Sequence, residues 1–156
     1  MKQLFILVLI LIFIGIFNTA CHNSKSNIVP YQTIEQYINK NFPDTEPTQS
    51  GMYLIKEQCT SNEPLVAGDW VKVHYTGYLI DSTVFDSSLK RNEAFEFQLG
   101  TNSVIPGWEE AISLMKVGEK ATAIIPSYLG YGSSANGSIP ANADLIFSLE
   151  IVDSHK

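Results

Sequence analysis

The sequence predicts an α+β fold in which an antiparallel β-sheet curls around one short α-helix. Two observations favour this fold: several short segments alternate apolar and polar side chains, and one segment carries a single apolar helical stripe. A sheet and a helix that each have one apolar face must bury it against a partner. Packing the helix into the curl buries both faces, and 156 residues suffice for one core of ordinary size.

Five segments have the pattern of strands. The clearest is residues 69–79, where Val71, Val73 and Tyr75 fall on one face, and polar side chains such as His74 fall on the other. The remaining strands are expected at residues 52–55, 95–99, 121–125 and 145–151. A turn is expected at residues 81–82, and the long Gly-, Ser- and Tyr-rich loop at residues 126–140 has the character of a functional loop.

The central helix is expected to follow Pro106 and Gly107. Its apolar stripe consists of Trp108, Ala111, Ile112 and Met115, at the spacing of successive helical turns. Acidic residues occupy the first turn, Lys116 is expected in the last turn, and Gly118 is placed to end the helix.

The N-terminal region has the pattern of an export signal. Lys2 precedes an apolar run at residues 4–17, and Thr19 and Ala20 stand immediately before Cys21. This resembles a bacterial lipobox, in which the cysteine becomes the lipidated first residue, although Asn18 replaces the usual aliphatic residue. The alternatives are a plain signal peptide with a chance cysteine, or an uncleaved anchor.

The sequence therefore predicts three parts: a lipoprotein signal peptide at residues 1–20, a lipid-anchored tether at residues 21–50 and a folded domain at residues 51–156. The tether is expected to contain a short helix, for which Thr33 is a candidate N-cap. These features predict a location in the bacterial cell envelope, most simply at the periplasmic side of the outer membrane.

Charge and composition argue against several partners. The net charge is −6 and the basic residues are scattered, so no basic stripe exists for a nucleic acid. Two cysteines and three scattered histidines lack the spacing of metal ligands. No metal or cofactor is expected, and the protein is expected to be monomeric.

A series of short motifs occurs in order between residues 51 and 152. The motifs are residues 73–77 (VHYTG), 85–88 (FDSS), 104–108 (VIPGW), 117–119 (VGE), 131–132 (YG), 139–140 (IP) and 145–147 (LIF). Each motif alone is weak evidence, but together, at this spacing, they resemble the FK506-binding (FKBP) family of peptidyl-prolyl cis-trans isomerases.

The resemblance implies a shallow apolar pocket whose floor is Trp108, with one indole face reachable from solvent. It implies pocket residues of two kinds. The candidate catalytic residues are Tyr75, Asp86 and Tyr131, and the candidate substrate-binding residues are Phe85, Phe95, Val104, Ile105, Trp108, Ile139 and Phe147. The Ile105 N–H and the Tyr131 hydroxyl are implied to donate hydrogen bonds to substrate carbonyls. A structural reading of the aromatic residues as core, and of Asp86 as a turn cap, stands beside this one.

The sequence departs from the family pattern at three positions. Ser82 replaces a turn glycine, Gly130 replaces an alanine beside Tyr131, and Ser138 replaces an apolar residue that contacts ligand. The last change is expected to weaken binding of macrolides or to shift the sequence preference.

The implied activity is isomerisation of X–Pro bonds in unfolded or proline-containing polypeptides, with FK506-type macrolides as further ligands. The membrane is a partner through the lipid anchor. The alternative is an FKBP-like chaperone or docking module in a membrane complex, whose isomerase activity is incidental. A solute-binding lipoprotein is disfavoured because the chain is too short for two lobes.

Overall fold

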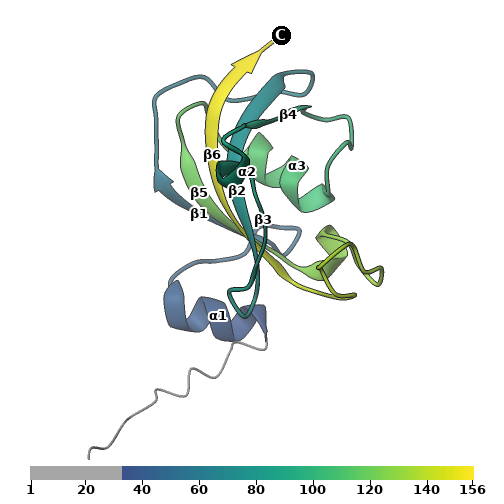
Figure 1. The fold of residues 1–156 in the computed structure, drawn as a ribbon. Coiled ribbons are helices and arrows are strands. Elements are labelled where there is room, and N and C mark those ends of the chain that lie inside the picture. The colour runs from purple at the N-terminus through teal and green to yellow at the C-terminus, as the bar shows by residue number, and fades with distance from the viewer. Residues whose placement is uncertain (1–32) are drawn as a thin grey trace, which may run out of the picture.

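The structure is a computed structural model, of which we describe residues 33–156 (Figure 1). Six antiparallel strands form one sheet in the order β1-β5-β6-β2-β3, and β4 pairs with β2. The strands are β1 (Tyr53–Gln58), β2 (Trp70–Leu79), β3 (Val84–Ser87), β4 (Phe95–Gln98), β5 (Lys120–Ile125) and β6 (Leu145–His155). The helices are α1 (Ile34–Asn41), α2 (Ser88–Arg91) and α3 (Pro106–Ser113), and residues Ser127–Leu129 form one 3₁₀ turn.

The sheet curls around α3, which confirms the predicted fold class (Figure 1). Strands β2 and β6 form its long central pair, from Trp70 opposite His155 to Leu79 opposite Leu145. The inner face of β2 presents Val71 and Val73, which are fully buried. The α3 residues Ala111 and Ile112 are also fully buried, so the helical stripe and the inner sheet face form one core.

Helix α3 is shorter than the sequence pattern predicts. It ends at Ser113 with Leu114 as the C-cap residue, so the placement of Lys116 in its last turn is wrong. Met115 follows the helix and is still fully buried, because the chain turns and keeps this side chain in the core. Gly118 does not end the helix but adopts a left-handed conformation (φ +84°) in the following turn.

The short elements beside the helix are absent from the sequence prediction. Strand β3 and helix α2 follow one another directly within residues 84–91, where no apolar periodicity is long enough to reveal either. The predicted turn at residues 81–82 is present, and Ser82 has a φ of +70° in it. That left-handed conformation explains why glycine suits this position better than serine.

Helix α1 covers the opposite face of the sheet. Thr33 caps it, since its hydroxyl accepts a hydrogen bond from the Gln36 N–H at 3.2 Å, as the sequence predicts. Ile38 is buried against Ile124 and Ile146, which point away from the α3 side of β5 and β6. Helix α1 and the C-terminus lie at opposite ends of the sheet (Figure 1). Within residues 33–156, no helix is long and apolar enough to cross a membrane.

Candidate functional site

A hollow of about 210 Å³ opens between the inner face of the sheet and the start of α3. We call it the aromatic hollow. Its lining residues come from β2, β3, β4, β6, α3, the loop before α3 and the loop between β5 and β6: Tyr75, Phe85, Asp86, Phe95, Ser103, Val104, Ile105, Trp108, Tyr131 and Phe147. The structure thus brings together residues that are separated by up to 72 positions in the chain.

Trp108 lies at the centre of an aromatic cluster. Its ring centroid is 5.0 Å from that of Tyr75, 5.3 Å from that of Phe147 and 5.9 Å from that of Phe95. All three rings meet the indole nearly edge-on, at interplanar angles of 75–85°. Edge-to-face contacts of this kind hold each ring in one orientation, so the walls of the hollow are preorganised.

The indole is more enclosed than the sequence analysis expects. Trp108 is only 4% exposed, so the expectation of one solvent-reachable face is wrong, because the edges of the neighbouring rings cover most of it. The indole Nε1 is buried and is the one such side-chain nitrogen or oxygen in residues 33–156 without a hydrogen-bond partner. Trp108 therefore meets the aromatic hollow through a narrow strip of its surface.

One candidate substrate-binding residue does not line the aromatic hollow. Ile139 is 5% exposed and packs in the core, because its loop turns the side chain inward. Ser138, next to it, is exposed and also lies outside the lining. Ser103 does line the hollow and was missed, since a serine in a loop carries no pattern in the sequence.

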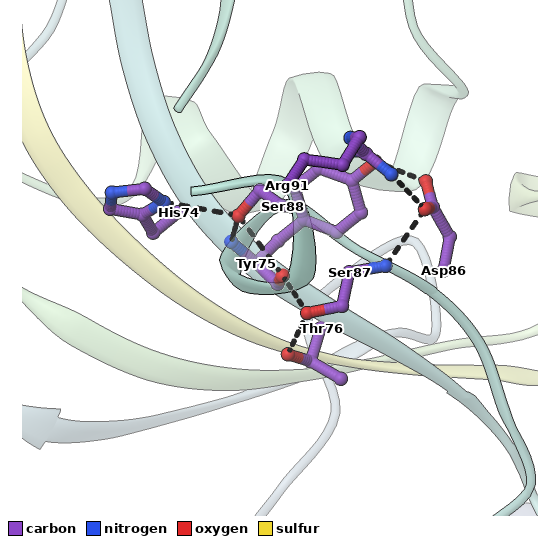
Figure 2. A network of polar contacts seen from close by, with 7 residues as sticks. All are labelled: His74, Tyr75, Thr76, Asp86, Ser87, Ser88 and Arg91. Atoms are coloured by element: carbon purple, nitrogen blue, oxygen red, sulfur yellow. Dashed lines mark hydrogen bonds and ion pairs between the residues drawn. The ribbon is translucent and has the colours of Figure 1, made fainter. Parts of the chain in front are cut away.

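Asp86 is held at the rim by a polar triad that Figure 2 shows. The Tyr75 hydroxyl and the Arg91 guanidinium both donate to the Asp86 carboxylate, and Arg91 also donates to the Tyr75 hydroxyl oxygen at 3.0 Å. The Asp86 carboxylate also accepts from the N–H of Ser87, the last residue of β3, at 2.8 Å. Arg91 comes from α2, an element that the sequence pattern did not reveal, and its role went unpredicted for that reason.

The triad sets the charge of its members. Burial raises the pKa of Asp86, but the hydrogen bonds from Arg91 and Tyr75 outweigh burial and leave this pKa below its ordinary value. Burial and the hydrogen bond to Asp86 raise the pKa of Tyr75. At neutral pH the rim therefore carries a carboxylate, a neutral phenol and a guanidinium, and the anion and cation are paired.

Ser88 fixes the strand segment that carries Tyr75. Its hydroxyl accepts from the Tyr75 N–H at 2.8 Å and lies 3.2 Å from the Tyr75 carbonyl oxygen (Figure 2). Ser88 is fully buried, and His74 Nδ1 lies 3.1 Å from the same hydroxyl on the side away from the hollow. This contact places His74 behind the strand, where it helps to hold the Ser88 hydroxyl. Ser87 and Thr76 join the two strands through their hydroxyls at 2.9 Å.

Two hydrogen-bond donors at the aromatic hollow are left without an acceptor in the described part of the chain. One is the Ile105 backbone N–H, which immediately precedes α3. The other is the Tyr131 hydroxyl, whose side chain is 37% exposed. Since both line the hollow, they are available to a bound molecule. Residues 33–156 contain no cluster of His, Cys, Asp or Glu arranged to hold a metal ion.

A family model for the FKBP-type peptidyl-prolyl cis-trans isomerases matches residues 61–152. The chain belongs to this family. Among curated proteins it is similar to the FKBP-type peptidyl-prolyl cis-trans isomerase FkpA of Aeromonas hydrophila, with 46% identity over 125 residues. It is also similar to FK506-binding protein 2 of Yarrowia lipolytica, with 50% identity over 100 residues, which cover 64% of this chain and 68% of that FKBP.

Solved FKBP structures have the same fold. The crystal structure of FkpA from Escherichia coli matches 77% of this chain with a TM-score of 0.69 and 32% identity. That of AtFKBP13 matches 72% of this chain and 99% of its own, with a TM-score of 0.67 and 30% identity. The matches to FkpA cover 78% and 77% of this chain but only 46% of the Aeromonas protein and 55% of the E. coli chain. The chain thus spans about half the length of these FkpA relatives.

Proposed function

We propose that this protein catalyses cis-trans isomerisation of X–Pro bonds, with the proline ring in the aromatic hollow. The observation that supports this most is the pair of free donors beside an apolar floor. Ile105 and Tyr131 both line the hollow, together with Trp108, and neither the Ile105 N–H nor the Tyr131 hydroxyl has a hydrogen-bond partner within residues 33–156. An apolar ring flanked by two carbonyl groups is the ligand that satisfies both features.

The chemistry requires no bond to break. Rotation about a peptide bond faces a barrier of ~18–20 kcal/mol, because resonance stiffens the C–N bond. The two X–Pro isomers differ by only ~0.5–1 kcal/mol, yet they exchange in tens to hundreds of seconds. A catalyst therefore needs to stabilise the twisted amide relative to the planar one.

An enclosed aromatic site favours the twisted amide. Water stabilises the charge-separated resonance form of the planar amide, and a hollow walled by Tyr75, Phe95 and Phe147 displaces that water. Burial of the proline ring contributes ~25 cal/mol per Å² to binding. The Ile105 N–H and the Tyr131 hydroxyl then hold the flanking carbonyls, while Asp86 and Arg91 keep Tyr75 in place.

The substrates proposed are unfolded or proline-containing polypeptides outside the cytoplasm. Support for the location comes from the sequence alone: Cys21 and the preceding signal lie outside the described residues. A lipid-anchored isomerase would meet exported chains as they fold near the membrane, where proline isomerisation limits many folding reactions.

The test is the exchange rate between the cis and trans forms of a Leu-Pro peptide, measured by NMR with catalytic amounts of the full chain in detergent. We expect acceleration, and we expect an excess of FK506 to remove it by occupying the aromatic hollow. Peptide binding without acceleration would favour the chaperone or docking role instead.

A further inference from the structure

A second hollow adjoins the aromatic hollow. It measures about 610 Å³ and is lined by Lys72, Arg91, Glu93, Ala94, Phe95 and Glu96; we call it the charged hollow. The two hollows meet at two places. Phe95, which is 39% exposed, lines both of them, and Arg91 of the charged hollow is paired with Asp86 of the aromatic hollow.

Both cations of the charged hollow already have carboxylate partners. Arg91 is paired with Asp86. Lys72 Nζ lies 3.7 Å from a carboxylate oxygen of Glu96 and 3.7 Å from one of Asp153. Neither cation is therefore free to attract an acidic ligand.

Glu93 is the charged residue of this hollow without a partner. Its side chain is exposed, and its carboxylate has no ion pair or hydrogen bond within residues 33–156. Its backbone is nevertheless held, because its N–H donates to the Ser88 carbonyl at 3.3 Å, directly after Asn92 closes α2 with a φ of +53°. The backbone that carries this free carboxylate is thus fixed at the charged hollow, which Phe95 also lines.

We propose that Glu93 is a specificity-determining residue that selects polypeptides with a Lys or Arg close to the proline. The inference rests on the proposed function, since it needs the proline in the aromatic hollow. An extended chain advances ~3.3 Å per residue, so a side chain two or three positions from the proline reaches across Phe95. There it meets an unpaired carboxylate, whereas an acidic side chain at the same place is repelled.

The strength of the preference follows from the exposure of the site. An ion pair in contact with water is worth ~0.2–1 kcal/mol and weakens with added salt. We therefore expect the catalytic efficiency on a basic peptide to exceed that on its neutral counterpart by a factor of roughly 1.4 to 5 at low ionic strength.

The experiment uses two peptide series with a constant Leu-Pro core. One series carries Lys, Gln or Glu two residues before the proline, and the other carries them two residues after it. Exchange rates are measured by NMR with the full chain in detergent, at low ionic strength and again with added salt. In at least one series we expect the Lys peptide to exchange fastest and the Glu peptide slowest, with the Gln peptide between them. Added salt should reduce the differences between these rates.

The decisive variant is Glu93→Lys, for which we expect the order to invert. Glu46→Lys is the matched control: it makes the same charge change at an exposed position outside both hollows, and the order should stay that of the wild type. Equal rates across both series, or an unchanged order in Glu93→Lys, would overturn the inference about Glu93. In that case, isomerisation of the Gln peptides would still support the proposed function. If no peptide were isomerised, the proposed function would fail, and the inference with it.

Discussion

At the scale of single residues, the site depends on how a few side chains are held. Asp86 points along the rim only because Tyr75 and Arg91 both donate to it. Tyr75 in turn is fixed at its backbone by the buried Ser88 hydroxyl. Asp86 and Tyr75 are thus each held by a further residue, which fixes this part of the wall of the aromatic hollow.

Removing polar groups of the rim should lower catalysis without unfolding the protein. Asp86→Leu takes away the acceptor that orients Tyr75, and Tyr131→Phe takes away a free donor at the hollow. We expect each change to lower kcat/KM for a Leu-Pro peptide by roughly tenfold, the equivalent of one lost hydrogen bond of about 1–2 kcal/mol. The far-UV spectrum and the melting temperature serve as controls, and variants as active as wild type would refute these assignments.

The pH dependence of Asp86 gives an independent test of the triad. Because its pKa is lowered in the folded protein, its ionised form contributes stability above the ordinary value of 3.8, and that contribution is lost as the pH falls through the lowered pKa. Asp86 therefore stays ionised between about pH 8 and about pH 5, and its titration should not change the isomerase activity in that range. In Arg91→Gln the Asp86 midpoint, followed by ¹³C NMR of the carboxyl carbon, should move upward. An unmoved midpoint would show that the ion pair does not form in solution.

At the scale of elements, the sequence predicted the helices and strands that are long enough to show a regular apolar pattern. The alternation in β2 and the stripe of α3 were each strong enough to place an element and its buried face. Strand β3 and helix α2 have four residues each, which is too short for a period to be visible, and so Arg91 was missed with them. Ile139 was misplaced for a related reason: a motif match says which loop a residue occupies, but not which way its side chain turns.

Glu119, in the loop between α3 and β5, connects that loop to β1 and to the loop after β1. It is 2% exposed, forms an ion pair with Lys56 of β1 at 2.9 Å, and accepts from the backbone N–H groups of Thr60 at 3.4 Å and Lys116 at 3.1 Å. Burial raises the pKa of Glu119, but these partners outweigh it and lower the pKa. The stabilisation is therefore present above pH ~4.5 and fades as the pH falls below that value.

Glu119→Gln should accordingly destabilise the fold at neutral pH. We expect the free energy of unfolding, measured with urea, to fall by about 2–3 kcal/mol, because buried donors lose a charged acceptor. Glu150→Gln is the control, since Glu150 pairs with Lys120 at 3.3 Å on an exposed surface and should cost less than about 1 kcal/mol. Equal losses in both variants would contradict a buried anchoring role for Glu119.

At the scale of the whole molecule, one side of the sheet holds the aromatic hollow and the other side is covered by α1. Ile38 seals that outer face against Ile124 and Ile146. The 3₁₀ turn adds a link between the two sides, because the Tyr128 hydroxyl donates to the Ser50 carbonyl at 2.8 Å. Within the proposed tether, the described residues from Thr33 onward are therefore packed onto the domain.

The proposed lipid anchor is tested by a single substitution. Cys21→Ala removes the thiol that would carry the lipid, so we expect it to abolish labelling by a radioactive fatty acid and to release the protein from the membrane or block signal cleavage. A diacylglycerol with a third acyl chain would otherwise hold the protein stably, at ~0.8 kcal/mol per buried CH₂. Equal label on wild type and variant would rule out lipidation at Cys21.

The central claim is that proline binds against Trp108 in the aromatic hollow, and the two tryptophan indole N–H resonances test it within one protein. Trp70 stacks on His155 at 6.5 Å at the far end of β2 and serves as the internal reference, and a Trp70→Phe variant assigns the two signals. In a ¹H–¹⁵N titration with a Leu-Pro peptide, we expect the Trp108 resonance to shift to saturation while that of Trp70 stays in place. A Trp108 resonance that does not move at peptide concentrations where isomerisation is accelerated would show that catalysis takes place elsewhere.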